Sequence, residues 1–238
     1  KHRMHIGAIA LYSKILRAIS TGFYFKIIAD LMEQLDFTYA INTKFGPVKF
    51  HCSSETVRIR ATQMLEREPD TIEWIEGFEK GETLWDVGAN VGVFTLYSAI
   101  ARDAKVVAFE PLPWNHTGLV QNLALNGITD QVMAVQAAVN DETTVSVINV
   151  PVERGDIVGA SDCPFGEPVG NMGVSVDTKY RIQTIGYSLD DFIERFDVPF
   201  PNHIKVDVDG IEMKVIKGAR KIIRDPRMKS IMIKVEPG

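Results

Sequence analysis

The sequence has only two cysteines, Cys52 and Cys163, and neither belongs to a CxxC pair. Two isolated cysteines exclude a disulfide framework and a thiolate zinc site, and they favour a reducing, cytoplasmic location. No run of about 18 apolar residues is free of charged side chains, so we expect no membrane span. The chain begins with Lys1, which leaves a removed signal peptide open.

Basic residues are outnumbered by acidic ones. Lysine and arginine number 26 against 31 aspartates and glutamates, a formal net charge of −5. A protein that mainly coats nucleic acid needs a basic footprint, so we expect no nucleic-acid partner. Hydrophobic residues make up 45% and charged residues 24%. This ordinary globular mix excludes a disordered chain or a coiled coil as the whole structure.

The first 53 residues are interpreted as an extension of helices and a β-hairpin. Apolar positions recur at helical spacing across residues 6–35, which predicts one or two amphipathic helices. Residues 37–51 alternate and contain Phe45-Gly46-Pro47, which predicts the hairpin with its turn at residues 44–47. We expect the helices to pack on the domain or on a second subunit, which would make a homodimer. Contact with a membrane interface is a less favoured alternative.

Two helices, over residues 54–67 and 71–78, precede a region in which short strands alternate with helices. This order predicts a mostly parallel sheet with helices on both faces, in one α/β domain over residues 54–238. We expect strands at residues 84–87, 106–110, 132–136, 203–208 and 230–235, and helices at 92–101, 115–125, 189–196 and 211–223.

Residues 151–187 interrupt the alternation and are rich in glycine and proline. A loop of this length inside a compact domain is usually functional or mobile. We interpret the segment as a lid over the substrate site, with short extra strands near residues 174–176 and 181–185.

The turn after the first strand of this domain reads Asp86-Val87-Gly88-Ala89-Asn90-Val91-Gly92. In a doubly wound sheet such a turn lies outside the carboxyl ends of the strands, where nucleotides bind. The spacing is GxxxG and departs from GxGxxG, because Asn90 stands where a dinucleotide fold has glycine. The carboxylate of Asp86 repels a phosphate and suits an ammonium group. The turn therefore fits a ligand with a positive amino group, while a tight turn without any ligand is the alternative.

Glu110 ends the second strand, 24 residues after Asp86, where an acidic residue accepts the hydroxyl groups of a ribose. Pro111 and Leu112 follow and offer an apolar face to a base. An amino group, a ribose and a base together describe S-adenosylmethionine, which is the cofactor we expect.

Several further stretches share a pattern with one family. The sequence resembles the FkbM family of S-adenosylmethionine-dependent methyltransferases, over roughly residues 54–236. The resemblance implies a Rossmann-like class I methyltransferase fold and O-methylation of a hydroxyl group on a sugar, glycan or natural product. The matching stretches are Glu68-Pro69 with Trp74, residues 86–94, residues 109–111, residues 137–141, residues 189–191, residues 204–212 and residues 217–219.

Carried over residue by residue, the resemblance assigns a cofactor site. Asp86, Gly88, Ala89, Asn90 and Gly92 would hold the methionine part, and Glu110 with Pro111 the ribose and base. The backbone around Ala138 would meet the adenine, and Asn115 would support the loop after the second strand or cap its helix. The family usually has glutamate where this chain has Asp209, which shortens the reach of that side chain.

Methyl transfer to an alcohol requires alignment of acceptor, methyl group and sulfur, and a group that receives the proton. Asp207 is our first candidate for contact with cofactor or acceptor, followed by Asp209 and by Glu236 at the end of the last strand. Helix capping is the alternative for Asp209 and Glu212. The spacing of these acids and His203 is not diagnostic of a metal, so we assign none.

Two other functions stay open at this point. A nicotinamide dinucleotide oxidoreductase is disfavoured by Asn90 and Asp86 in the turn, and a non-catalytic binding module is disfavoured by the complete set of acidic residues. The NPPY-type sequence of many base-methylating enzymes is absent after the fourth strand, which reads Asp207-Val208-Asp209-Gly210. The expected partner is therefore a small-molecule or glycan hydroxyl acceptor.

Overall fold

The computed structural model describes residues 14–15, 21–35, 37–152, 158–161, 163–168, 175, 177–208 and 210–234. The chain divides into two units, residues 1–37 and residues 38–238. In the first unit, helix α2 (Thr21–Gln34) confirms the helical pattern for its part of residues 6–35. Its Phe25 and Met32 are exposed, and the ring of Tyr24 contacts that of Phe25. No described helix is both long and apolar enough to cross a membrane.

The predicted hairpin forms from β1 (Thr38–Thr43) and β2 (Gly46–His51). It belongs to the second unit, and the domain boundary expected between residues 53 and 54 stays a prediction. A pair of side-chain hydrogen bonds fixes β2 to a helix of the second unit. The backbone N–H of Lys49 donates to Asn126 Oδ1 (2.9 Å), and that of His51 donates to Asn122 Oδ1 (2.7 Å).

The helix expected over residues 54–67 is divided at Gln63 into α3 (Glu55–Thr62) and α4 (Met64–Arg67). Ser54 caps α3 by accepting a hydrogen bond from the N–H of Val57. Helix α5 (Pro69–Glu76) begins earlier than expected, with proline in its first turn, where the missing N–H costs nothing.

The predicted parallel sheet is confirmed. Its five strands are hydrogen-bonded in the order β10-β9-β3-β4-β5, and every pair is parallel. The strands are β3 (Thr83–Val87), β4 (Lys105–Phe109), β5 (Val132–Val135), β9 (His203–Val206) and β10 (Ser230–Ile233). The carboxyl ends of β4 and β9 therefore flank that of β3.

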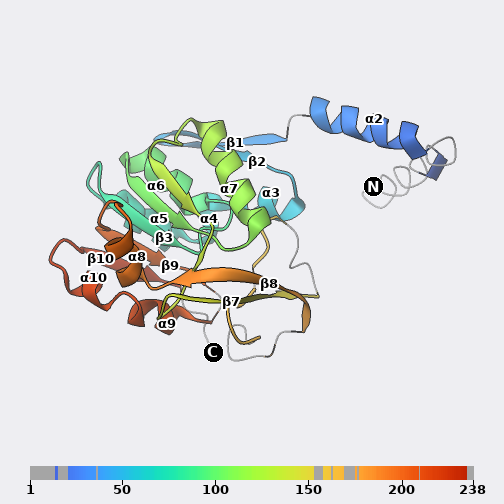
Figure 1. The fold of residues 1–238 in the computed structure, drawn as a ribbon. Helices are drawn as coiled ribbons and strands as arrows, with labels where there is room; N and C mark the ends of the chain where they lie inside the picture. Colours follow the sequence, from blue (N-terminus) through green and yellow to red (C-terminus); the bar gives the residue numbers. More distant parts are fainter. Residues whose placement is uncertain are drawn as a thin grey trace. The chain divides into compact units, whose positions relative to one another are not determined.

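Helices cover both faces of this sheet, as Figure 1 shows. Leu84 and Ala108 point to a core that includes residues of α6 and α7, whereas Trp85 and Val107 point to a core that includes residues of α8, α9 and α10. Burial on both faces is why the strands read as continuous apolar runs. The helices are α6 (Val93–Arg102), α7 (Pro113–Asn126), α8 (Leu189–Arg195), α9 (Glu212–Lys217) and α10 (Arg220–Arg224).

One helix was expected over residues 211–223, and the structure has α9 and α10 instead. At the break, the carbonyl oxygen of Gly218 accepts the N–H of Asp190, and the Asp190 carboxylate accepts the N–H groups of Lys221 and Ile222 at the start of α10. Glycine is needed at position 218 because an added Cβ would lie 2.2 Å from the carbonyl oxygen of Asn140.

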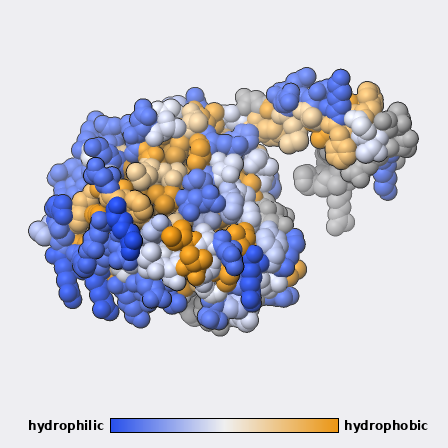
Figure 2. Space-filling view, in the orientation of Figure 1, coloured by the Kyte–Doolittle hydropathy of each residue, from blue (hydrophilic) through white to orange (hydrophobic). Residues whose placement is uncertain are grey.

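A second sheet occupies part of the segment that was expected to be a loop. It pairs β6 (Ala138–Val139) and β7 (Thr144–Pro151) with β8 (Thr178–Tyr187), in the order β6-β8-β7. The expectation of a strand near residues 181–185 is confirmed by β8, and β6 and β7 were missed. Expected strand residues 174 and 176 lie outside the described residues. Figure 2 shows that apolar residues on the visible face of this unit form separate groups between hydrophilic ones.

His203 is the first residue of β9 and lies at the amino-terminal edge of the sheet, opposite the carboxyl ends of the strands. It belongs to a buried polar network. Its Nε2 donates to Glu82 Oε2 (2.9 Å), and its Nδ1 lies 2.8 Å from Ser230 Oγ. Its ring stacks on Phe78. Glu82 also pairs with Lys229 and accepts the N–H of Glu79. Burial opposes ionisation of Glu82, but these donors outweigh it and lower its pKa to about 2.

We predict that Glu82→Gln destabilises the protein at pH 7 by about 1–3 kcal/mol, because a buried charge-assisted network loses its negative charge and one of its two accepting oxygens. The lowered pKa means that ionised Glu82 stabilises the fold fully above its ordinary pKa of 4.5, and that this contribution is lost as pH falls toward about 2. Denaturant unfolding at pH 7 and pH 3 should therefore show a smaller acid loss in the variant. Glu79→Gln, at an exposed acid near the same lysine, is the control; equal pH dependence in Glu82→Gln and the parent would contradict the assignment.

Candidate functional site

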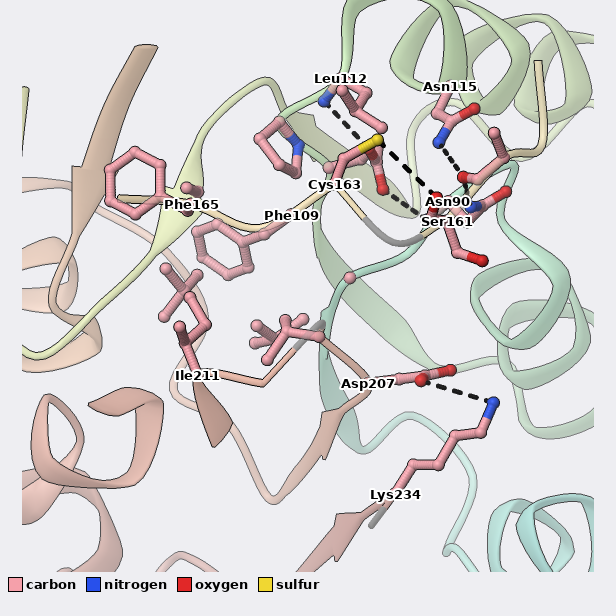
Figure 3. Close-up of a pocket in the computed structure, with 18 of the residues that line it drawn as sticks. Asn90, Phe109, Leu112, Asn115, Ser161, Cys163, Phe165, Asp207, Ile211 and Lys234 are labelled. Carbon is pink, nitrogen blue, oxygen red and sulfur yellow. Dashed lines mark hydrogen bonds and ion pairs between the residues drawn. The ribbon is translucent and has the colours of Figure 1, made fainter. Parts of the chain in front are cut away.

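A pocket of about 260 Å³ lies at the carboxyl ends of β3, β4 and β9. Figure 3 shows Asn90, Ser161, Cys163 and Leu112 grouped in one part of it and Asp207 with Lys234 in another. An apolar wall is made by Phe109, Pro111, Leu112, Ala137, Ala138, Val139, Phe165 and Ile211. The volume lies just below the usual range of about 300–1,000 Å³ for small-molecule sites.

Glu110 lies in this pocket and joins two turns. Its Oε2 accepts the backbone N–H of Asn90 (2.8 Å), and its Oε1 accepts the backbone N–H of Leu112 (2.9 Å). The carboxylate is almost fully buried. The turn after β3 and the turn after β4 are thus held by one side chain.

Gly88 and Gly92 are required by contacts inside the protein. Both have a positive φ, of 84° and 88°. A Cβ on Gly88 would lie 2.0 Å from the carbonyl oxygen of Asp207, and one on Gly92 would lie 2.5 Å from Leu119 Cδ1. Gly88 therefore lets the end of β9 lie against the turn after β3, which we call the first turn, and Gly92 makes room for α7.

Asn90 and Asn115 together hold residues 158–161 against the pocket. The Nδ2 atoms of both donate to the carbonyl oxygen of Ala160, at 2.8 and 3.0 Å. Asn115 Oδ1 also accepts the N–H of Gly159 (2.7 Å). From the sequence, Asn115 was expected either to support the loop after the second strand or to cap its helix. In the structure it supports a different loop, residues 158–161. The amide of Asn90 is used to fix the wall of the pocket.

Asp207 lies between two lysines. Its Oδ2 accepts a hydrogen bond from Lys205 Nζ at 3.0 Å, and Lys234 Nζ is 3.6 Å from its Oδ1 (Figure 3). Lys205 is buried, with its Nζ 4.6 Å from the ring centre of Phe94. Burial would raise the pKa of Asp207, but Lys205, Lys234 and Arg60 outweigh it and hold that pKa below its ordinary value. Asp207 is therefore an anion at neutral pH.

Asp86 is buried beneath the site and does not line the pocket. Its Oδ2 accepts a hydrogen bond from Thr95 Oγ1 (2.6 Å), and its Oδ1 has no hydrogen-bond partner among the described residues. Burial raises the pKa of Asp86. Lys205, its partner on the adjacent strand β9, lowers that pKa. The side chain of Asp86 thus lies behind the pocket wall, in a group of charged side chains that also includes Lys205 and Asp207.

The remaining residues expected at the site divide into three groups. Pro111 and Ala138 line the pocket, whereas Ala89 is buried and does not. Glu212 also lines it and stands in the first turn of α9, where its Oε1 accepts the N–H of Gly210; α9 has no side-chain capping hydrogen bond at its N-cap residue Ile211. Asp209 and Glu236 lie outside the described residues. Within the described ranges, no group of three or more His, Cys, Asp or Glu residues is arranged to hold a metal ion.

Sequence reasoning missed three cations in the pocket wall: Arg60 of α3, Arg67 of α4 and Lys234 after β10. Arg60 and Arg67 are about two helical turns apart in sequence, a spacing that places side chains on one face of a helix. That spacing was the available signal, but surface arginines are common on helices. Only the fold brings them to the carboxyl edge of the sheet.

A parallel sheet of this order, with a pocket outside its carboxyl ends, defines a Rossmann-like α/β protein that binds a ligand at the turns. The profile of the family described as Methyltransferase FkbM domain matches residues 86–237. The chain therefore belongs to the FkbM methyltransferase family, and the resemblance seen in the sequence is confirmed.

Individual relatives share about 30% of their residues with this chain, over part of each protein. The chain is 33% identical over 148 residues to the hexuronic acid methyltransferase AglP of Haloferax volcanii, covering 60% of this chain and 52% of that protein. It is 28% identical over 156 residues to methyltransferase sdnD of Sordaria araneosa, covering 56% of this chain and 58% of that protein. The chain thus spans little more than half the length of these relatives.

Among solved structures, a precorrin-6y C5,15-methyltransferase from Geobacter metallireducens matches 71% of this chain and 61% of its own. The sequence identity is 12% and the TM-score is 0.40. A likeness at this level assigns no function.

We predict that Gly88→Ala is much more destabilising than Gly81→Ala. Both glycines have nearly the same φ, 84° and 81°, but an added Cβ at Gly81 meets no atom within 4 Å. The left-handed backbone costs each variant about 1–2 kcal/mol. The collision with the Asp207 carbonyl adds about 1–3 kcal/mol to Gly88→Ala alone. Equal free energies of unfolding in the two variants would contradict the close contact between the first turn and β9.

Proposed function

We propose that the protein is an S-adenosylmethionine-dependent methyltransferase that methylates a hydroxyl group of a sugar, glycan or natural product. The observation that carries the proposal is the placement of Glu110 and Asp207. They follow β4 and β9, the two strands that flank β3, and both line the pocket beside the first turn. Two acids at this edge suit a ligand with a diol at one end and an ammonium group at the other.

The donor set of the pocket fits this cofactor. Glu110 is the acceptor for the ribose hydroxyl groups, because a carboxylate can accept about four hydrogen bonds and can hold both turns and a sugar. The apolar wall around Leu112, Ala138 and Phe165 suits the adenine. The turn has no stretch of open amides at its centre that would suit a pyrophosphate, and Glu110 beside it would repel one. A nicotinamide dinucleotide is therefore the weaker candidate.

Asp207, rather than Asp86, is the carboxylate in position to meet the ammonium group. Asp207 lines the pocket, whereas Asp86 is buried behind it. We assign Asp86 a positioning role: it lies in register with Lys205, and Lys205 in turn donates to Asp207. This replaces the direct contact with Asp86 that the sequence predicted.

The cofactor, when bound, supplies an electrophilic methyl group on a sulfonium. The chain's task is then to orient the acceptor, exclude water and provide an acceptor for its proton. Asp207 is a weak base, because its pKa is held below the ordinary value. It orients the ligand better than it removes a proton, and Asp209 and Glu236 stay candidates for that second role.

The acceptor is a sugar or a sugar-like molecule. One relative is a hexuronic acid methyltransferase, which supports this acceptor for the chain.

Residues 151–187 include part of the pocket wall. The wall includes Ala160, Ser161, Cys163 and Phe165, which supports the expected lid for this part of the segment. A cytoplasmic location and a homodimer through the N-terminal helices stay predictions. Transfer of labelled methyl groups to a panel of hydroxylated acceptors would identify the substrate class.

We predict that the chain binds S-adenosylhomocysteine and does not bind NAD in isothermal titration calorimetry. Glu110→Gln should weaken S-adenosylhomocysteine at least tenfold, because the amide cannot accept from both turns and the ribose. Glu212→Gln, at a pocket acid in the first turn of α9, should change the affinity less than twofold. Binding of NAD with no response to S-adenosylhomocysteine would overturn the proposed function.

We predict that Asp207→Asn also weakens S-adenosylhomocysteine about tenfold, the value of one charge-assisted contact of about 1.4 kcal/mol. Since the pKa of Asp207 is lowered, the side chain stays ionised in mildly acidic solution. The dissociation constant of the parent protein should therefore agree within twofold between pH 5.5 and pH 7.5. A tenfold loss of affinity at pH 5.5 would contradict the ion-pair network around Asp207.

A further inference from the structure

The first turn has no N–H group to offer an anion at its centre. The backbone N–H groups of Gly88 and Ala89 both donate to the carbonyl oxygen of Phe109, and that of Asn90 donates to Glu110. The N–H of Val91 donates to Asn90 Oδ1, and that of Gly92 to the carbonyl oxygen of Ala89. Helix N-termini usually bind anions through such amides. A carboxylate in this pocket must find its partner elsewhere.

Arg60 is the side chain in position to supply that partner. It is half-buried, lines the pocket, and donates Nε to the carbonyl oxygen of Gly159 at 2.7 Å. This bond fixes the side chain while leaving both terminal nitrogens of the guanidinium unused. Within the described part of the chain, Arg60 makes no other hydrogen bond and no ion pair. A guanidinium held in this way presents a fork that matches a carboxylate.

Charges of both signs lie around Arg60. Burial lowers the pKa of Arg60, and the neighbouring cation Arg67 lowers it further, although Asp207, Glu110 and Glu68 act in the opposite direction. Two arginines that face one pocket repel each other until an anion lies between them. Lys234, the third cation of the wall, is already paired with Glu68 at 3.1 Å.

We propose that Arg60, supported by Arg67, binds the carboxylate of the amino-acid part of the cofactor. The inference rests on the proposed function and extends it, because a methionine moiety carries both an ammonium and a carboxylate group. Asp207 meets the ammonium, and Arg60 meets the carboxylate. Arg60 belongs to α3, before the residues 86–237 that match the family, so the site includes a residue from outside the matched region.

The test compares two ligands that differ by the amino-acid part. S-adenosylhomocysteine carries it, whereas 5′-methylthioadenosine has the same adenosine and sulfur without it. Calorimetry on Arg60→Met should show at least a tenfold loss of affinity for S-adenosylhomocysteine and less than a twofold change for 5′-methylthioadenosine. Arg60→Lys should recover part of the loss, because it keeps the charge without the fork.

Three controls separate this role from a structural one. Arg58→Met removes an exposed arginine of the same helix, paired with Glu55, and should alter neither affinity. Asn115→Ala loosens residues 158–161 without removing a charge, and should weaken both ligands alike. Decarboxylated S-adenosylhomocysteine should bind Arg60→Met and the parent protein equally.

Two results would overturn the assignment. An equal loss for both ligands in Arg60→Met would make Arg60 only an anchor for Gly159, and an unchanged affinity for S-adenosylhomocysteine would remove it from the cofactor site. If the parent protein bound neither ligand, the proposed function would fail first, which separates the two failures.

Discussion

The site depends on one buried carboxylate that holds two turns together. Glu110 accepts the backbone N–H of Asn90 from the turn after β3 and that of Leu112 from the turn after β4. Strand pairing alone places these turns side by side, but it does not fix their backbone donors. Because both oxygens of Glu110 are committed in this way, the carboxylate is oriented before any ligand arrives. Preorganisation of this kind lowers the cost of binding.

The opposite side of the site is set by charges arranged along adjacent strands. Asp86 of β3 is in register with Lys205 of β9, and Lys205 donates to Asp207 at the end of its own strand. Gly88 lets the first turn lie against the backbone of Asp207. The buried Lys205 is paired with Asp207 at 3.0 Å and is also influenced by the charge of Asp86 on the adjacent strand, which makes its burial tolerable. The pocket therefore receives an ionised Asp207 in a fixed position.

The sequence was sufficient for the sheet and for the residues at its strand ends. Apolar runs separated by helical patterns predict β3, β4, β5, β9 and β10, and Glu110 and Asp207 follow from their places after strands. Other features depend on contacts that no local pattern carries. The helix expected over residues 211–223 is divided at Gly218, where Asp190 of α8 bonds to both sides of the break, and β6 needs β8 as its partner. Arg60 reads as an ordinary helical arginine until the fold brings α3 to the pocket.

The most direct test of this account is a crystal structure of the chain with S-adenosylhomocysteine. We expect the ribose hydroxyl groups to lie within hydrogen-bond distance of Glu110 and the ammonium group to lie at Asp207. The hydrogen bonds from Asn90 and Leu112 to Glu110 should be retained. A bound ligand whose ribose lies away from Glu110, or a Glu110 side chain that leaves the two turns, would contradict it.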